Sequence, residues 1–226
     1  METNGELTKV LARASTRGAA LLILLATCVF ADTLGLATGF AQLRLLLMIQ
    51  NGEEVSDFAA DLSDFLYGGV GLIQALVFVL TAVVWLVWLK AAYKNLTLVG
   101  SRRTKFTPGW AVGYWFVPFI NLVRPYQIMK ELWNRSDDEN QSATDSLYTP
   151  SILPAWWATW ILSNFAGNLM FRQSLAADDL ASFLVSTKTG LINDGLTVLA
   201  GSFAIFIVLQ IWKRQKAFST SSQVKT

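Results

Sequence analysis

Residues 68–89 read GGVGLIQALVFVLTAVVWLVWL, a run of 22 residues without one charged side chain. An α-helix rises 1.5 Å per residue, so this run makes a helix of about 33 Å, enough to cross a hydrocarbon core of about 30 Å. A lone strand would leave its backbone groups unpaired in lipid. The run therefore predicts a transmembrane helix.

Three more apolar stretches have the length of a span, at residues 18–38, 151–171 and 191–212. Across its 226 residues the chain is 53% hydrophobic and only 15% charged. Soluble domains carry about 25% charged residues, so this composition excludes an ordinary soluble domain. The predicted fold is an all-α integral membrane protein with four transmembrane helices.

A fifth apolar stretch is too short to be a simple span. Residues 109–123 read GWAVGYWFVPFINLV, with Pro118 inside and Pro108 and Pro125 on either side. A straight helix of that length covers about 22 Å, which is less than the hydrocarbon core. Because proline removes a helical hydrogen bond, we expect a broken, re-entrant segment that returns to the side from which it entered.

The distribution of basic residues supports a segment that returns. In that topology both termini share one side with 15 of the 18 basic residues, and the other side has only Arg44, Arg172 and Lys188. The positive-inside rule then places both termini in the cytoplasm, with the chain in the plasma (inner) membrane. If residues 109–123 crossed instead, the basic stretch 213–216 would face outside.

One membrane domain is predicted at residues 18–217, after a cytoplasmic lead at 1–17 and before a polar tail at 218–226. The first span has a second interpretation, a signal peptide cleaved after Ala31. The long lead and the apolar residues that follow Asp32 favour a retained span. All nine tryptophans fall in the cytoplasmic half, which is typical of a one-sided aromatic belt or of an aromatic-lined cavity.

Several motifs in the centre of the chain resemble those of the DUF4328 family. They are WLKAAYKN at 88–95, PGWAVGYWFVP at 108–118, NLVRPYQ at 121–127 and ELW at 131–133. The resemblance covers about residues 15–217. It implies a small multi-pass bacterial membrane protein, and it implies no activity, cofactor or site residues.

Residues 125–135 predict a short amphipathic helix on the cytoplasmic surface. Its apolar side chains Ile128, Met129 and Leu132 are expected opposite Lys130 and Glu131. Before the broken segment, three basic residues form a small cluster that would anchor the chain to anionic lipid: Arg102, Arg103 and Lys105.

Arg124 is the main candidate for binding. It follows the apolar segment directly, and a guanidinium at that depth needs a carboxylate, a carbonyl, water or a lipid phosphate. Glu131 lies seven positions further, about two turns of a helix, so both side chains can face one side. A purely anchoring role for Arg124 is the alternative. The other candidates for ligand or partner binding are Asn95, Trp110, Trp115, Asn121 and Tyr126.

Catalysis is the weakest function class for this sequence. The chain has no histidine and a single cysteine, Cys28, which excludes imidazole-based catalysis and Cys-rich metal sites. No catalytic residue, metal site or cofactor is predicted, and a net charge of +2 gives no sign of nucleic acid. We expect a non-catalytic protein that binds a partner protein or lipid.

A transporter or channel component with its site at the broken segment is the second hypothesis. It is weakened by the scarcity of polar residues in the predicted spans. Asp32 and Asp194 are expected near the outer interface as hydrated helix ends, with no carboxylate deeper in the bilayer.

Overall fold

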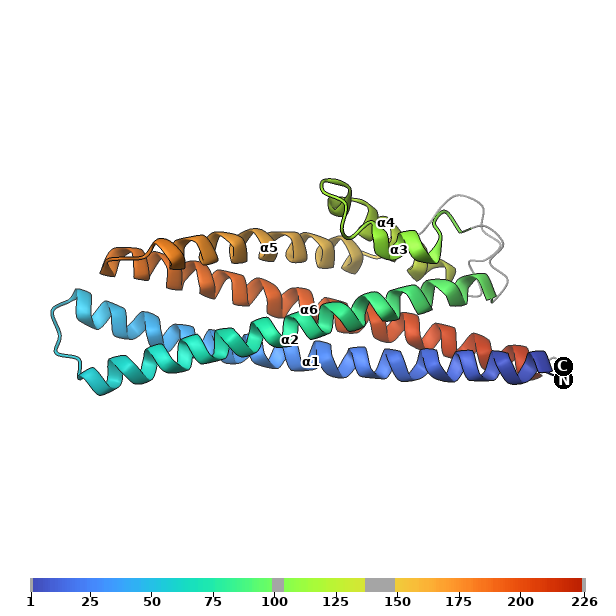
Figure 1. Ribbon diagram of the computed structural model, residues 1–226, viewed down its shortest axis with the longest axis horizontal. Coiled ribbons are helices and arrows are strands. Elements are labelled where there is room, and N and C mark those ends of the chain that lie inside the picture. The colour runs from blue at the N-terminus through green and yellow to red at the C-terminus, as the bar shows by residue number, and fades with distance from the viewer. Residues whose placement is uncertain (1, 99–103, 137–148, 225–226) are drawn as a thin grey trace. The chain divides into compact units, whose positions relative to one another are not determined.

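The computed structural model describes residues 2–98, 104–136 and 149–224, with side chains for 16–96, 104–136 and 149–217 (Figure 1). Of the described residues 87% are helical, and none of them forms a strand. The elements are α1 (Glu2–Gln50), α2 (Asp57–Leu98), α3 (Pro108–Gly113), the 3-10 turn η1 (Ile120–Leu122), α4 (Arg124–Arg135), α5 (Ile152–Ala176) and α6 (Leu180–Val224).

Three helices in the described part are long and apolar enough to cross a membrane. The spans are Thr16–Gln50 in α1, Asp57–Leu96 in α2 and Leu180–Ala217 in α6. They contain three of the stretches predicted as spans. The fourth predicted stretch forms α5, which has 25 residues and is not one of these three helices.

The long helices extend well beyond the predicted apolar stretches. α1 continues past Arg44 to Gln50, and α2 starts at Asp57, so the acidic run before residue 68 forms its first turns. α6 starts at Leu180, eleven residues before the predicted span. A helix can continue through polar residues beyond an apolar stretch, because its hydrogen bonds join backbone groups four residues apart and do not require lipid around them.

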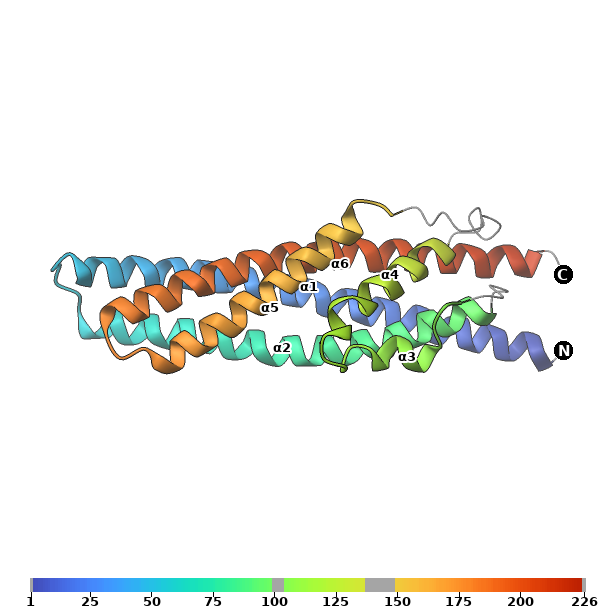
Figure 2. The same ribbon diagram turned by 90° about the horizontal axis from the view of Figure 1, so that it is seen from above.

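The chain divides into two compact units, and α1, α2, α5 and α6 each contribute to both. The first unit comprises residues 1–25, 80–155 and 203–226, and the second comprises 26–79 and 156–202. Within the second unit, the loop between α1 and α2 and the loop between α5 and α6 lie at the same end (Figures 1 and 2).

The largest fully buried side chains of the first unit come from five helices. They are Leu21 of α1, Leu89 and Tyr93 of α2, Pro125, Ile128, Met129, Glu131 and Leu132 of α4, Leu153 of α5, and Ile207, Val208 and Ile211 of α6. Burying an aliphatic side chain of this size contributes about 1.5–3 kcal/mol. The apolar face of α4 is therefore part of the core of this unit.

One feature of the predicted amphipathic helix is wrong. Glu131 was expected on the exposed face of α4, but its exposed fraction is 1%. Residues three and four apart share a helix face, so Glu131 lies on the same side as Ile128 and next to Leu132. A buried carboxylate needs hydrogen-bond donors, and the structure supplies them.

Candidate binding site at the broken segment

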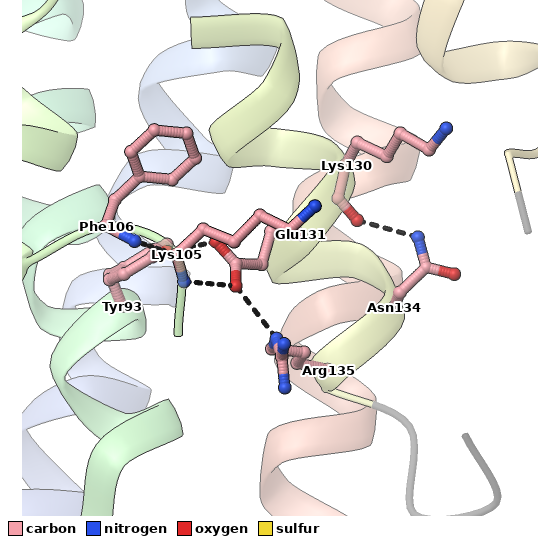
Figure 3. A network of polar contacts seen from close by, with 7 residues as sticks. All are labelled: Tyr93, Lys105, Phe106, Lys130, Glu131, Asn134 and Arg135. Atoms are coloured by element: carbon pink, nitrogen blue, oxygen red, sulfur yellow. Dashed lines mark hydrogen bonds and ion pairs between the residues drawn. The ribbon is translucent and has the colours of Figure 1, made fainter. Parts of the chain in front are cut away.

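A buried polar network joins α2, α4 and the chain before α3 (Figure 3). The Tyr93 hydroxyl donates to Oε2 of Glu131. The backbone N–H of Lys105 donates to Oε1 of Glu131 at 2.8 Å, and the N–H of Phe106 donates to the Tyr93 hydroxyl at 3.3 Å. Arg135 forms an ion pair with Glu131, Nε to Oε1, at 2.8 Å. The buried carboxylate is thus both hydrogen-bonded and neutralised.

This network fixes both ends of the broken segment at one level of α2. Lys105 precedes the segment and Glu131 follows it. Glu131 accepts from the hydroxyl of Tyr93 and from the backbone N–H of Lys105. Midway between them, the Trp115 ring lies edge-on to Trp85, with centroids 6.1 Å apart. Trp85 lies eight residues before Tyr93, or about 12 Å along the helix. The segment therefore runs along α2 from Tyr93 to Trp85 and back.

Local sequence explains why the segment is not one helix. α3 begins at Pro108, and the Thr107 hydroxyl caps it by accepting from the N–H of Trp110 at 3.3 Å. The helix ends at Gly113, and no helix includes Pro118, as expected from its missing N–H. Phe119 then has a φ of 61°, a backbone conformation that is strained for a bulky residue.

The turn after α3 exposes its apolar side chains. We call residues 116–123 the apolar tip. Its most exposed side chains are those of Phe119, at 87%, and Phe116, at 70%. Its other exposed hydrophobic residues are Ile120, Leu122 and Val123. Exposed apolar patches of this kind mark sites that contact a membrane or another protein.

Arg124 lies immediately after the apolar tip, with its guanidinium over two adjacent aromatic rings, Phe106 and Tyr114, which contact each other edge to face. Its Cζ is 5.6 Å from the centroid of Phe106 and 5.7 Å from that of Tyr114. Nη1 donates to Oε1 of Gln127 at 2.8 Å. A guanidinium has five N–H donors, and here it is exposed, so this arrangement orients a cation towards an external acceptor.

Comparison with known families agrees with the motifs around this segment. The sequence model of a family described as a domain of unknown function, DUF4328, matches residues 51–213. The chain belongs to the DUF4328 family. No curated protein and no solved structure matched the chain. In this DUF4328 protein the family match extends from the loop before α2 into α6, and it includes the whole polar network and the apolar tip.

The DUF4328 protein brings some of the predicted site residues together. Trp110 is 55% exposed, and its ring centroid lies 5.0 Å from that of Tyr114. Tyr114 is one of the two rings that contact Arg124. Trp115, which packs on Trp85, and also Asn121 and Tyr126 are half-buried. We call Trp110, Tyr114 and Arg124, which ring contacts join, the aromatic and basic face.

Two predicted site residues belong to other contacts. Glu131 is buried and bonded to Tyr93 and Arg135, whereas Arg124 is exposed and donates to Gln127. Asn95 is buried, and its Nδ2 lies 3.4 Å from Oε1 of Gln215 in α6. Of the predicted lipid anchor, Lys105 is exposed, whereas Arg102 and Arg103 lie outside the described residues.

Sequence reasoning missed the residues that tie α6 to this unit. Gln215 donates to the carbonyl of Ala92 at 3.1 Å and to the Ser136 hydroxyl at 3.2 Å. The guanidinium of Arg214 lies 4.3 Å from the ring centroid of Trp133. Two residues could have indicated these contacts from the sequence. Tyr93 lies in the WLKAAYKN motif and Gln215 in the basic end of the last span, and each is a polar residue directly after an apolar span.

A second polar cluster lies within the second unit of the DUF4328 protein, and it corrects the expectation for Asp32 and Asp194. Nε2 of Gln74 donates to Oδ1 of both carboxylates, at 3.2 Å each. Asp194 is 7% exposed and lies fourteen residues after the start of α6, so it is not a hydrated helix end. A Cβ on Gly35 would lie 2.4 Å from Nε2 of Gln74, so only glycine permits this approach.

The described residues contain no group of three His, Cys, Asp or Glu side chains able to hold a metal ion.

Proposed function

We propose that this DUF4328 protein is a non-catalytic multi-pass membrane protein that binds a partner protein or lipid through its aromatic and basic face. In this proposal α1, α2, α5 and α6 are four spans in the plasma (inner) membrane, and both termini are cytoplasmic. Residues 109–123 enter the cytoplasmic leaflet and return. The contacts of Lys105 and Glu131 at Tyr93 support the return, and the contact of Trp115 with Trp85 supports the depth.

One observation carries the binding proposal. Arg124 is exposed over two adjacent aromatic rings, and the apolar tip that precedes it exposes Phe116 and Phe119. Apolar side chains of this size are unfavourable in water, and a guanidinium held among rings is suited to planar anionic groups. The pair of features supports a binding surface more directly than it supports a packing role.

The available acid–base groups support a non-catalytic function. Glu131 is the carboxylate nearest to the segment in sequence, and it is buried and paired with Arg135. A general base must reach a substrate proton, which a carboxylate enclosed by three donors does not do.

A transporter or channel component is the second candidate, and one observation favours it. Asp32, Gln74 and Asp194 come from three helices that are long enough to span the membrane, and they meet within those spans. Ionisable residues inside a membrane are costly and often belong to ion or substrate pathways. Flux that is lost in Asp194→Asn while the protein remains inserted would support this candidate over a binding role.

The binding function can be tested with a photo-crosslinking amino acid at Trp110, on the aromatic and basic face. We expect a specific protein or lipid adduct in cells, and we expect Arg124→Ala to remove it without lowering the amount of protein in the membrane. The same crosslinker at the exposed Phe171 of α5 is the matched control. Equal adducts at both positions, unaffected by Arg124→Ala, would refute the proposed function.

The topology can be tested by cysteine labelling in a Cys28→Ser background. Cysteines at Gly52 and Asp178 should react with an impermeant maleimide applied to intact cells, because both loops are proposed to be external. A cysteine at Ser151, before α5, should react only after the cells are opened. Labelling of Ser151→Cys from outside would contradict both the four spans and the returning segment.

A further inference from the structure

Within residues 104–130, which the structure describes in full, the charged side chains are all positive. Residues 104–130 contain three cationic side chains, Lys105, Arg124 and Lys130, and no acidic residue. The next residue, Glu131, is a carboxylate, but it is buried and neutralised by Arg135. A ligand that approaches this surface therefore meets cations without a competing exposed carboxylate from the same stretch.

Arg124 is oriented by neutral groups. Its guanidinium packs over the adjacent rings of Phe106 and Tyr114, and Gln127 accepts one of its N–H groups at 2.8 Å. α4 begins at Arg124, so the positive end of the helix dipole adds to the charge of the guanidinium. None of these neighbours cancels its charge, and together they reduce the entropy that the side chain loses on binding.

The apolar tip places this cation beside an apolar medium. Phe119 and Phe116 are the most exposed side chains of the tip, and Val123, next to Arg124, is exposed as well. In a bilayer, apolar side chains enter the acyl region while an adjacent arginine stays at the level of the phosphates. A soluble anion would match the cation alone and would leave the apolar tip uncovered.

We propose that Arg124 binds the phosphate of an anionic phospholipid, with the apolar tip inserted among the acyl chains of the same leaflet. This inference rests on the proposed function and specifies its ligand. The guanidinium supplies paired N–H donors for two phosphate oxygens, a geometry that a lysine ammonium does not reproduce. Lys105, which is also exposed, adds charge attraction to an anionic surface.

The headgroup can be tested by native mass spectrometry of the purified full-length protein, titrated with phosphatidylglycerol or with phosphatidylcholine of the same acyl chains. We expect the wild type to retain phosphatidylglycerol preferentially. Arg124→Ala should weaken that retention by about tenfold, the effect of losing a charge-assisted contact. Arg124→Lys should weaken it less, and Arg172→Ala, an exposed arginine of α5, should leave it unchanged.

Three results would overturn the lipid assignment. They are equal retention of the two lipids, equal retention by wild type and Arg124→Ala, and displacement of phosphatidylglycerol by inorganic phosphate at similar concentration. If Arg124→Ala unfolds at lower temperature than the wild type, Gln127→Ala provides the second test. It frees the guanidinium from its 2.8 Å contact and should weaken retention two- to threefold, about 0.4–0.7 kcal/mol.

A separate measurement distinguishes failure of this inference from failure of the proposed function. A dye on Phe119→Cys, in the Cys28→Ser background, should be quenched by brominated acyl chains in nanodiscs. Quenching without a headgroup preference would refute the phosphate site and leave the returning segment intact. An absence of quenching, with a protein adduct at Trp110, would refute lipid as the ligand and favour a protein partner.

Discussion

The backbone N–H of Lys105 donates to Oε1 of Glu131 at 2.8 Å, across 26 positions of sequence. The two residues therefore close a loop that contains α3, the apolar tip and the start of α4. Tyr93 of α2 donates to the other oxygen of the same carboxylate, which fixes the closed loop to a long helix. One buried carboxylate thus determines where the broken segment begins and ends.

Tyr93→Phe should loosen this closure. The substitution removes the hydroxyl that donates to Glu131 and accepts from the N–H of Phe106. A buried group left without its partner costs about 1–3 kcal/mol, so the midpoint of thermal unfolding in detergent should fall. Tyr126→Phe, on the half-buried side of α4, is the control and should leave the midpoint unchanged. An equal midpoint for both variants would contradict the structural role of the network.

The sequence predicted the helical class and the break at Pro118, because length, hydropathy and proline geometry act locally. It also singled out Arg124 as a candidate for binding, because an arginine directly after an apolar run is conspicuous, and that role stays a prediction. It misplaced Glu131 on the exposed face, because a pattern of polar and apolar residues does not show that a carboxylate has a distant Tyr93 and a nearby Arg135 as partners. Such pairing depends on tertiary structure.

The same limit explains the two aspartates. Asp32 and Asp194 are separated by 162 positions, and no local pattern indicates that Gln74 joins them. Their expected place near the outer interface followed from the ends of the apolar stretches. The predicted first span ends at residue 38, but α1 continues to Gln50. The predicted fourth span starts at residue 191, but α6 starts at Leu180.

Phe119→Gly should separate stability from binding. Phe119 has a φ of 61°, which glycine adopts freely, so relief of strain should raise stability by about 1 kcal/mol. The same change removes the most exposed ring of the apolar tip and should weaken contact with acyl chains. Phe116→Gly is the control, because it removes an exposed ring from a residue without positive φ. If Phe119→Gly lowers stability as much as this control does, the strain argument is wrong.

Gly35→Ala should disrupt the polar cluster of the second unit. The new Cβ would lie 2.4 Å from Nε2 of Gln74 and 2.6 Å from Oδ2 of Asp194, so the bridging amide must move. Loss of its hydrogen bonds should cost about 1–2 kcal/mol. Gly71→Ala in α2 is matched to it, since nothing lies within 4 Å of that Cβ and alanine favours helix. Unfolding midpoints in detergent should therefore shift in opposite directions, and a shared direction would contradict the cluster geometry.

The start of α6 should respond to acid. The N–H of Ser182 donates to Oδ1 of Asp179 at 2.8 Å, and hydrogen bonds from Ser182 hold the pKa of this carboxyl below its ordinary 3.8. A lowered folded-state pKa gives stabilisation that is present above the ordinary pKa and is lost as pH falls through the folded one. Hydrogen exchange in the first turn of α6, corrected for intrinsic rates, should therefore accelerate as the pH falls below 3.8. Asp179→Asn should remove that acid response, whereas Asp178→Asn should retain it.

The most direct test of the binding face is extraction of wild type and Arg124→Ala from native membranes into polymer nanodiscs, followed by mass spectrometry of the lipids. We expect anionic phospholipid to be enriched around the wild type relative to the bulk membrane. We expect this enrichment to fall in Arg124→Ala at equal protein yield. Identical lipid profiles for the two proteins, both equal to the bulk membrane, would contradict the proposed phospholipid site.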